Sequence, residues 1–373
     1  MLAATLAAGS ARAQWEILPS GSTADLRGVQ AIGNGVVWAS GTQGTVLRTI
    51  NDGKQWQRCA TPPDAEHLDF RGVQAFDAST AIVMSSGKGD MSRLYKTTDG
   101  CKTWAVLFTN PDPEGFWDAL QIVDHGALEI AGDSVDHELV SEKIGHVIPV
   151  WRVSEGDAPI GQPSGHFFEL RADSSEGAFA ASNSALVVGL VPHRDPIWSY
   201  QWLATQTAGH SYVHREATEE TQACEPCRMG FLRAETPMGQ PSTTAGIFSL
   251  AFREDQFGVA VGGDYTKPDA IAKAAAYSQD AGVTWWLAAN PPHGYRSAVA
   301  YDGESKTWIA VGPNGTDVST DDGRNWRPLR PNAALHEAVD ADQHWNALSL
   351  PFVVGPHGRI GKLRAGALRV PVR

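Results

Sequence analysis

The chain has 373 residues, of which 38 are glycine and 22 are proline, and this density of turn formers argues against long helices and coiled coils. Its length suggests two or three domains, although an all-β ring or barrel can use it as one unit, and a hydrophobic content of 42% excludes disorder as the main state. With 30 basic and 42 acidic residues the formal net charge is −12, which argues against nucleic acid and anionic membrane surfaces as partners.

The first 13 residues predict an export signal. They are small and apolar, and Ala11-Arg12-Ala13 matches the A-x-A pattern that precedes a signal-peptidase cut, although the usual basic start is missing. A short helix is the alternative. We expect a truncated signal peptide over 1–13 and a mature chain over 14–373 in the periplasm or the medium. No later apolar stretch reaches the roughly 20 residues that span a bilayer, so we expect no transmembrane segment.

A repeated pair of inner strands follows. Leu26-Arg27-Gly28 begins a segment that recurs at Phe70-Arg71-Gly72, and looser copies begin near positions 117, 177, 248, 296 and 345. Each copy leads through one apolar run to a second run that ends in small residues, which is typical of strands packed on both faces. Seven such units predict one domain, an all-β seven-bladed β-propeller with four strands in a blade.

A second repeat, S/T-x-D/N-x-x-x-x-W, closes four of these units. Its third position can accept backbone N–H bonds within a tight turn, its fifth is usually glycine and permits a positive φ, and its tryptophan covers the blade. We expect a structural role, not a catalytic one, for these residues. They are Asn51, Asp99, Asp280 and Asp321 at the third position, and Trp56, Trp104, Trp285 and Trp326 at the eighth.

Two units depart from the pattern, and the last one is short. Unit three has only a stretched turn from Ser141 to Trp151, and unit four carries an insertion at about 207–229. Unit seven supplies strands at 347–350, 352–355 and 359–363 and then stops. Because Trp15 to Leu18 resembles the strand after each turn motif, we expect it to form the outer strand of blade seven and to close the ring.

Export makes disulfides plausible for the four cysteines. Cys59 and Cys101 fall on neighbouring units and are a candidate pair, and Cys101 replaces the glycine of the second turn motif, so we expect a strained turn or a disulfide there. Cys224 and Cys227 form a C-x-x-C in a polar stretch and are expected to be a local staple. Neither a metal site nor a redox site has its usual context around them.

The four turn motifs resemble the Asp-box, or BNR repeat, of sialidase-like propellers. The whole mature chain resembles the photosystem II assembly/stability-factor-like group of these propellers, whose bacterial members are often labelled oxidoreductase-like; residues 246–252, 258–268 and 293–301 carry this likeness. The resemblance implies a non-catalytic binding propeller with a protein or envelope-assembly client and without a cofactor. No dinucleotide, haem or flavin motif supports the oxidoreductase label.

The face on which the innermost strands begin is where a propeller would bind a ligand. The candidate residues of that face are Arg27, Arg71, Trp117, Asp118, Asp264, Tyr265, Lys267 and Arg296. Three arginines at equivalent positions could hold an anion or a glycan carboxylate, as in sialidases. The alternative is that Arg27 and Arg71 pair with loop carboxylates such as Asp69 or brace neighbouring blades. We assign no catalytic residue and no metal ligand, and an enzyme of this kind would be a sialidase-like glycoside hydrolase.

Overall fold

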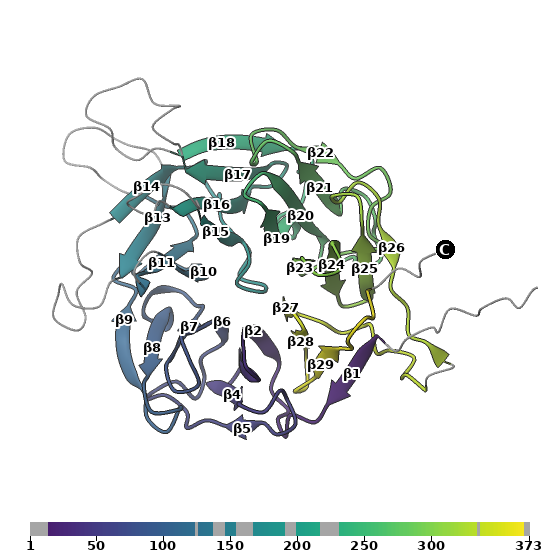
Figure 1. Ribbon diagram of the computed structural model, residues 1–373. Helices are drawn as coiled ribbons and strands as arrows, with labels where there is room; N and C mark the ends of the chain where they lie inside the picture. Colours follow the sequence, from purple (N-terminus) through teal and green to yellow (C-terminus); the bar gives the residue numbers. More distant parts are fainter. Residues whose placement is uncertain are drawn as a thin grey trace, which may run out of the picture.

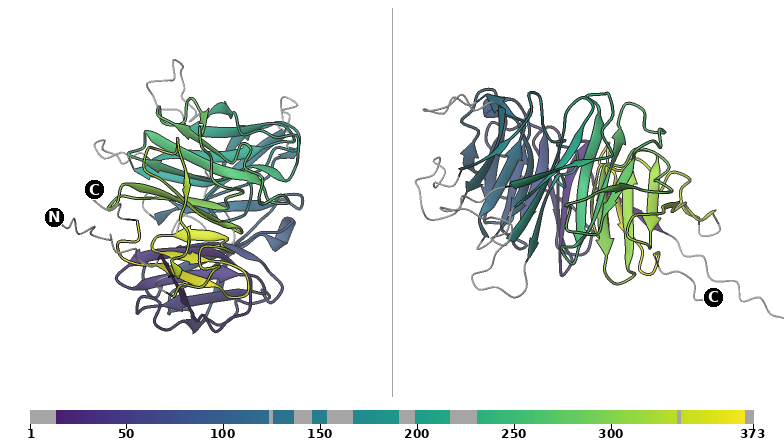
Figure 2. Two further views of the ribbon diagram at one scale, coloured as in Figure 1. Left: turned by 90° about the vertical axis from the view of Figure 1, so that its right-hand side faces the viewer. Right: turned by 90° about the horizontal axis from the view of Figure 1, so that it is seen from above.

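Seven antiparallel sheets stand around a central axis, as Figure 1 shows. The computed structural model describes residues 14–123, 126–136, 146–153, 167–190, 199–216, 231–333 and 336–368. The predicted seven-bladed propeller is therefore confirmed. In Figure 2 the strands run between two faces of the ring. We call the face where the innermost strands begin the top face and the opposite one the bottom face.

Each sheet is numbered below as a blade, and its strands are given from the channel outward. Blade one consists of β2 (Leu26–Gly33), β3 (Val36–Gly41), β4 (Thr45–Thr49) and β5 (Gln57–Arg58). Blade two consists of β6 (Phe70–Ala75), β7 (Ala81–Ser85), β8 (Arg93–Thr97) and β9 (Ala105–Thr109). Blade three consists of β10 (Trp117–Ile122), β11 (Leu128–Gly132) and β13 (His146–Val153), which pairs with both β12 (Val135–Asp136) and β14 (Phe167–Arg171). A short 3-10 helix, η1 (Gly89–Met91), lies between β7 and β8.

Blades four to seven complete the ring. Blade four consists of β15 (Leu186–Leu190), β16 (Ser199–Gln206), β17 (Ser211–Glu216) and β18 (Phe231–Thr236), and blade five of β19 (Ala245–Arg253), β20 (Phe257–Asp264), β21 (Ala275–Ser278) and β22 (Trp286–Leu287). Blade six consists of β23 (Ala298–Asp302), β24 (Thr307–Gly312), β25 (Gly315–Ser319) and β26 (Arg327–Pro328). Blade seven consists of β27 (Ala347–Ser349), β28 (Phe352–Val354), β29 (Ile360–Leu363) and β1 (Trp15–Leu18).

The first strand of the described chain closes the ring, as predicted. β1 pairs antiparallel with β29, with Trp15 opposite Leu363 and Leu18 opposite Ile360. Trp15 is 2% exposed and packs on Trp345 at 5.9 Å between ring centroids. Its Nε1–H donates to Oγ1 of Thr316 in blade six, at 3.2 Å. One indole therefore joins the first strand to two blades from the far end of the sequence.

The core of the protein lies between blades instead of in one central body. Buried apolar side chains form seven clusters among the described residues, and each joins two neighbouring blades. Because inner strands bury both faces, they are rich in valine and alanine, as in β3 and β24. The hydrophobic effect thus acts at every blade interface, at about 25 cal/mol per Å² of apolar surface removed from water.

The four turn motifs lie on the bottom face, between the third and fourth strands of their blades. In each, the hydroxyl at the first position accepts the backbone N–H of the fifth, as Ser278 does from Gly282 at 2.9 Å. The carboxylate or amide at the third position accepts the backbone N–H of the seventh, as Asp280 does from Thr284. The fifth residue has a positive φ in all four turns, including Cys101, at 64°.

Cys101 forms a disulfide with Cys59, with a Cα–Cα distance of 5.2 Å. Cys59 follows β5 of blade one, and Cys101 lies in the turn between β8 and β9 of blade two. The bond therefore joins the outer parts of two neighbouring blades. Cys224 and Cys227 lie outside the described residues.

The two irregular units differ from the sequence prediction. The stretched turn of unit three is wrong, because Trp151 lies inside β13, opposite Ile130 of β11. The insertion of unit four begins later than residue 207, because Ser211–Glu216 is the third strand of that blade. Its remainder, 217–230, lies outside the described residues. Among the described residues, no helix is long and apolar enough to cross a membrane.

Candidate functional site

Four innermost strands carry a β-bulge at the same place, beside the top of the channel. The register of each strand against its neighbour skips one residue close to its start. A bulge turns the skipped side chain away from the regular alternation of the strand. The skipped residues are Arg27, Arg71, Asp118 and Phe248. The fold therefore brings four side chains from blades one, two, three and five to the mouth of the channel.

Arg27 and Arg71 share one carboxylate. The Nε atoms of Arg27 and Arg71 lie 3.5 and 2.9 Å from the two oxygens of Asp69, respectively. All three side chains are partly exposed, between 22% and 30%. Arg71 also donates from Nη1 to the carbonyl oxygen of Ala180 in blade four, at 3.1 Å. The alternative prediction for Arg27 and Arg71, that they pair with Asp69, therefore agrees with the structure.

Asp118, which is buried, and Asp133, which is partly exposed, form a carboxyl pair next to these arginines. Burial, and then the charge of Asp133, raise the pKa of Asp118 well above its ordinary value, and the charge of Arg71 opposes this rise. Burial also raises the pKa of Asp133 to about 6. A hydrogen bond between two carboxyl groups needs a proton on one of them, so this pair holds a proton under mildly acidic conditions.

A segment of blade four closes the channel. Gly177 forms an isolated β-bridge with Gln206, and Leu186 pairs with Leu203. Nine residues of the inner segment therefore lie opposite only three residues of β16. The additional residues project inward as a loop, which we call the channel plug (residues 178–185). In Figure 1 it is the teal loop that reaches from β15 toward the middle of the ring. The unit-four start near position 177 was thus predicted, but the interruption of its strand was not.

The plug is hydrogen-bonded to blades on both sides of the channel. Asn183 accepts the backbone N–H of Leu120 at 2.7 Å and donates to its carbonyl oxygen at 2.8 Å, which ties the plug to blade three. Ser182 donates to the carbonyl of Ser297 in blade six at 2.8 Å. Ser184 donates to the hydroxyl of Ser249 in blade five at 2.7 Å. These side chains satisfy buried polar groups that an open, solvent-filled channel would leave to water.

An aromatic patch lies next to the plug on the top face and consists of Phe179, Phe248, Tyr265 and Tyr295. Phe179 of the plug stacks on Phe248 at 3.8 Å between ring centroids, and Tyr265 meets both rings edge-on. Tyr295 meets Phe248 edge-on at 4.7 Å. Tyr265 is 51% exposed, whereas burial raises the pKa of Tyr295. The patch therefore presents one solvent-exposed aromatic ring, that of Tyr265, which packs against largely buried aromatic rings.

Asp264, the last residue of β20, is buried, whereas the next residue, Tyr265, is exposed. Asp264 is 4% exposed and accepts hydrogen bonds from Thr244 at 2.8 Å and Thr266 at 2.7 Å. These bonds, chiefly the one from Thr266, lower its pKa to about 2. Lys267 lies 3.4 Å from Asp264, and its own side chain is 73% exposed. Asp264 thus holds the loop that presents Tyr265 and Lys267.

The predicted equivalence of Arg296 with Arg27 and Arg71 is wrong by one residue. The backbone N–H groups of Leu26, Arg296 and Trp345 each donate to a glycine carbonyl near the end of the preceding blade's second strand. Arg296 therefore occupies the core position of Leu26 and Trp345, and Ser297 takes the place of Arg27. Since a shift of one residue turns a strand side chain to the other face, Arg296 points into the blade interface.

Arg296 is fully buried in an ion pair of its own. Its Nε–H donates to Asp317 at 2.8 Å, and Nη1 donates to Asn314 at 2.6 Å. The ring Nδ1 of His293 lies 2.8 Å from the same carboxylate. Burial opposes the charge of Asp317, but the bonds from His293 and Arg296 hold its pKa below its ordinary value. The three arginines do not converge, so the glycan site built on them is not supported.

Trp117 is also not a surface residue. It is 1% exposed and stacks on Phe108 at 5.4 Å, because it occupies the same core position as Leu26 and Arg296. Asp118 is 2% exposed. Of the predicted candidates for the top face, Arg27, Arg71, Tyr265 and Lys267 keep access to solvent. Asp69 and Phe179 are also partly exposed on this face. For Phe179, the sequence signal was the long interval between the repeat starts near positions 177 and 248.

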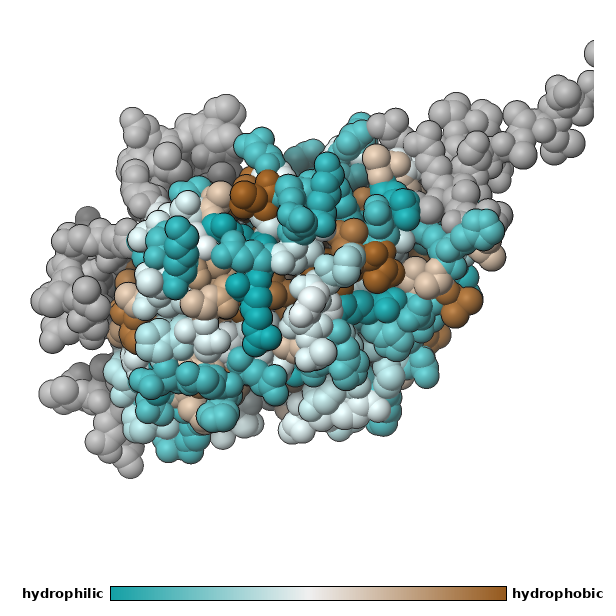
Figure 3. Space-filling view, turned by 90° about the horizontal axis from the view of Figure 1, so that it is seen from below, coloured by the Kyte–Doolittle hydropathy of each residue, from teal (hydrophilic) through white to brown (hydrophobic). Residues whose placement is uncertain are grey.

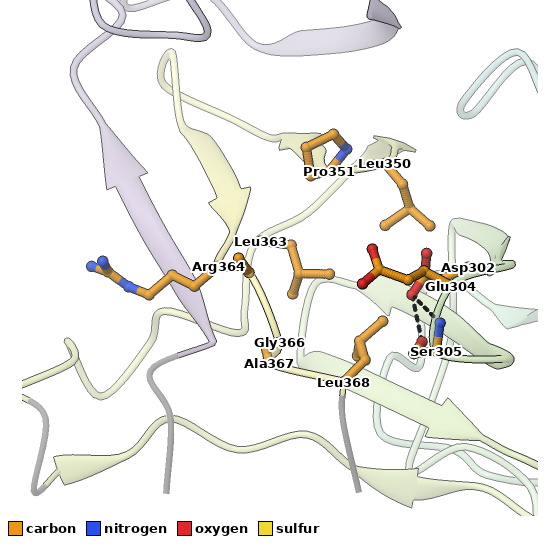
Figure 4. A pocket seen from close by; sticks show the side chains of 11 residues that line it. Asp302, Glu304, Ser305, Leu350, Pro351, Leu363, Arg364, Gly366, Ala367 and Leu368 are labelled. Atoms are coloured by element: carbon orange, nitrogen blue, oxygen red, sulfur yellow. Dashed lines mark hydrogen bonds between the residues drawn. The ribbon is translucent and has the colours of Figure 1, made fainter. Parts of the chain in front are cut away.

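A pocket of about 240 Å³ lies on the bottom face between blades six and seven. Figure 4 shows the side chains of Leu350, Leu363 and Leu368 pointing into it, while Arg364 points away. Asp302 on its wall accepts the backbone N–H of Ser305 at 3.1 Å. Within the described ranges, no group of three or more His, Cys, Asp and Glu side chains is arranged to hold a metal ion.

The fold and this site define a seven-bladed β-propeller whose channel is closed by its own chain and whose top face carries arginines beside an aromatic patch. Two similar solved structures are YCF48 bound to D1 peptide and YCF48 from Cyanidioschyzon merolae. The first has a TM-score of 0.56 and 14% sequence identity, covering 94% of this chain and 97% of that one. The second has a TM-score of 0.54 and 15% identity, covering 94% and 99%.

At this identity the likeness shows a shared fold over nearly the whole chain. No family model matches the sequence, and no curated protein matches it.

Proposed function

We propose that this chain is an exported, non-catalytic binding propeller of the photosystem II assembly-factor-like group, acting in the periplasm or the medium. Its four turn motifs would then be Asp-boxes with a structural role. In this proposal the top face binds an exposed segment of a client protein. The similar structure of YCF48 holds a D1 peptide, so this fold can serve as a peptide receptor.

The observation that carries the proposal is the arrangement of side chains around the channel plug. Arg27 and Arg71 share a single carboxylate, that of Asp69, and both arginine side chains stay partly exposed at the mouth of the channel. On the same face, Tyr265 packs edge-on against Phe179 of the plug and the buried Phe248. Exposed aromatic and arginine side chains on a rigid frame are the usual anchors of protein interfaces.

The side of the ring drawn in Figure 3 shows no large hydrophobic patch. It is largely hydrophilic, and its hydrophobic residues form small separate groups. Scattered apolar residues of this kind are normal on protein surfaces. The top face therefore remains the best candidate for client binding.

A photo-crosslinking amino acid placed at two matched positions tests the proposal. Tyr265, 51% exposed, lies on the top face, and Phe76, 40% exposed, follows β6 on the bottom face. In an envelope extract, we expect one defined protein to crosslink at position 265 and not at 76. Equal capture at both positions, or capture that survives Arg71→Glu, would sink the proposal.

A further inference from the structure

Among the described residues, β18 of blade four is the longest outer strand. It spans six residues and pairs with β17 over its full length without a register shift. The outer strands β5, β22 and β26 have two residues each, and the register of β9 against β8 is interrupted. A short or bulged outer strand offers little to a further strand, whereas a long, regular edge can pair with one. Within the part of the chain that the structure describes, no strand pairs with the outer side of β18.

The hydrogen-bond pattern of blade four determines which backbone groups of β18 face outward. Thr207 donates its N–H to the carbonyl of His210 in the loop between β16 and β17. In an antiparallel ladder, hydrogen-bonded and non-hydrogen-bonded residue pairs alternate. Continued through the registers of β16, β17 and β18, this alternation directs the N–H and C=O groups of residues 232, 234 and 236 toward β17. The N–H and C=O groups of Phe231, Arg233 and Glu235 therefore point outward, away from β17.

Two opposite charges lie on one face of this strand, two residues apart. Arg233 contacts Asp173 and Glu176 through Nη2, and its side chain is 30% exposed. A guanidinium has five N–H donors, so Arg233 can accommodate a further carboxylate. Glu235 pairs with His210, and its side chain is 61% exposed. Both charges are therefore accessible at the edge from which the outward backbone groups point.

We propose that β18 pairs antiparallel with β18 of a second copy of this chain, about a two-fold axis at Ala234. In this register Arg233 lies opposite Glu235 of the partner subunit, and by symmetry the pair occurs twice. Both residues direct their backbone groups outward, so they also form the hydrogen-bonded pairs of the new ladder. An axis at residue 233 or 235 would place like charges opposite each other, which is destabilising. Leu232, 44% exposed, gains Thr236 of the partner subunit as its neighbour.

This interface does not use the mouth of the channel. β18 lies on the perimeter of the ring in Figure 1, at the opposite edge of blade four from the channel plug. The pairing of two copies is therefore independent of the client binding proposed above, and both channel mouths stay open in the dimer.

Sedimentation velocity of the full chain over a range of concentrations tests the pairing. We expect a reversible equilibrium between monomer and dimer. Glu235→Arg places two arginines opposite each other, so the concentration at half dissociation should rise at least about tenfold. Glu16→Arg is the matched control and should leave the equilibrium unchanged, because Glu16 is also an exposed residue of an outer strand, paired with Arg364. A monomer at all concentrations, or equal effects of the two variants, would overturn the proposal.

Cysteine crosslinking tests the register. The two copies of Ala234 would form a non-hydrogen-bonded pair with about 4.5 Å between Cα atoms, which suits a disulfide. Under mild oxidation, Ala234→Cys should give a dimer bridged at residue 234, and mass spectrometry of the bridged peptide distinguishes it from bonds of Cys224 or Cys227. Leu232→Cys, on the same strand and more exposed, should not bridge to itself, because its two copies would lie about 14 Å apart. A dimer without the bridge at 234, or equal bridging at 232, would contradict this register and overturn the proposal.

Discussion

Arg296 and Asp317 form a buried ion pair at a position where other blades place an apolar core residue. The Nε atom of Arg296 lies 2.8 Å from Asp317 Oδ2, and both residues are at most 1% exposed. Arg296→Leu should cost about 3–5 kcal/mol of unfolding free energy, because a buried carboxylate loses its charge partner. Arg296→Leu with Asp317→Asn should recover most of that loss. Denaturant titration measures both, and an additive loss would contradict the pairing.

The pH dependence of global stability follows from the Asp118–Asp133 pair. The pKa of Asp133 is raised to about 6 from 3.8, so the folded chain binds more protons than the unfolded chain between these values. The contribution of this group to the free energy of unfolding is therefore fully present below pH 4. It is lost as the pH rises toward 6, and the loss amounts to up to about 3 kcal/mol. Asp133→Asn should remove this decline. Urea unfolding at pH 4.5, 5.5 and 6.5 measures it, with Asp264→Asn as the control.

The disulfide between Cys59 and Cys101 closes a loop with a sequence separation of 42. Replacing both residues with alanine should cost about 4 kcal/mol, by the chain-entropy account of such cross-links. Cys59→Ala with Cys101→Gly should cost about 1 kcal/mol less, because glycine relieves the positive φ of 64° at this turn. Thermal unfolding under oxidising conditions compares the two variants. Equal melting temperatures would show that the turn is not strained.

Asn183 joins the channel plug to blade three through both functions of its side-chain amide. Asn183→Ala leaves the N–H and the carbonyl of Leu120 without their partner, which should cost about 1–3 kcal/mol. Exchange of the plug amides should accelerate more than exchange at β24. Asn325→Ala, at an exposed turn on the bottom face, is the matched control. A uniform change over all blades would argue that the plug is not an independent element.

Ring closure depends on one indole. Trp15→Ala should cost about 3–5 kcal/mol, since it empties a buried site between blades six and seven. Ile17→Ala on the same strand should have a small effect, because that side chain is 40% exposed. Denaturant titration of both variants makes the comparison. Similar losses would mean that β1 contributes by backbone pairing alone.

The sequence determines the ring more clearly than the site. Repeats with regular spacing revealed the seven blades, and the likeness of Trp15 to Leu18 to other outer strands revealed the closure. Register within an irregular strand was harder to read. Arg296 looked like Arg27 in the sequence, but a one-residue offset placed it in the core.

The plug and the carboxyl pair could not be predicted from the sequence, for a different reason. Asp118 and Asp133 meet because a bulge in β10 turns one of them inward, and a bulge has no fixed residue signature. Residues 178–184 are mostly small and show no periodicity, so only the long interval between the repeat starts near positions 177 and 248 indicated extra chain. Contacts between distant blades, such as Ser182 with Ser297, depend on the closed ring itself.

The pairing of β1 with β29 also has a consequence for the order of folding. Blades one to six can each complete their four strands as the chain lengthens, but blade seven needs a strand from the opposite end. The last sheet therefore forms by the longest loop closure in the molecule, and its partner strand must wait without a neighbour until then. A circularly permuted chain that begins at β27 and joins residue 368 to residue 14 would make every blade local. It should refold faster than the parent while keeping the same final structure.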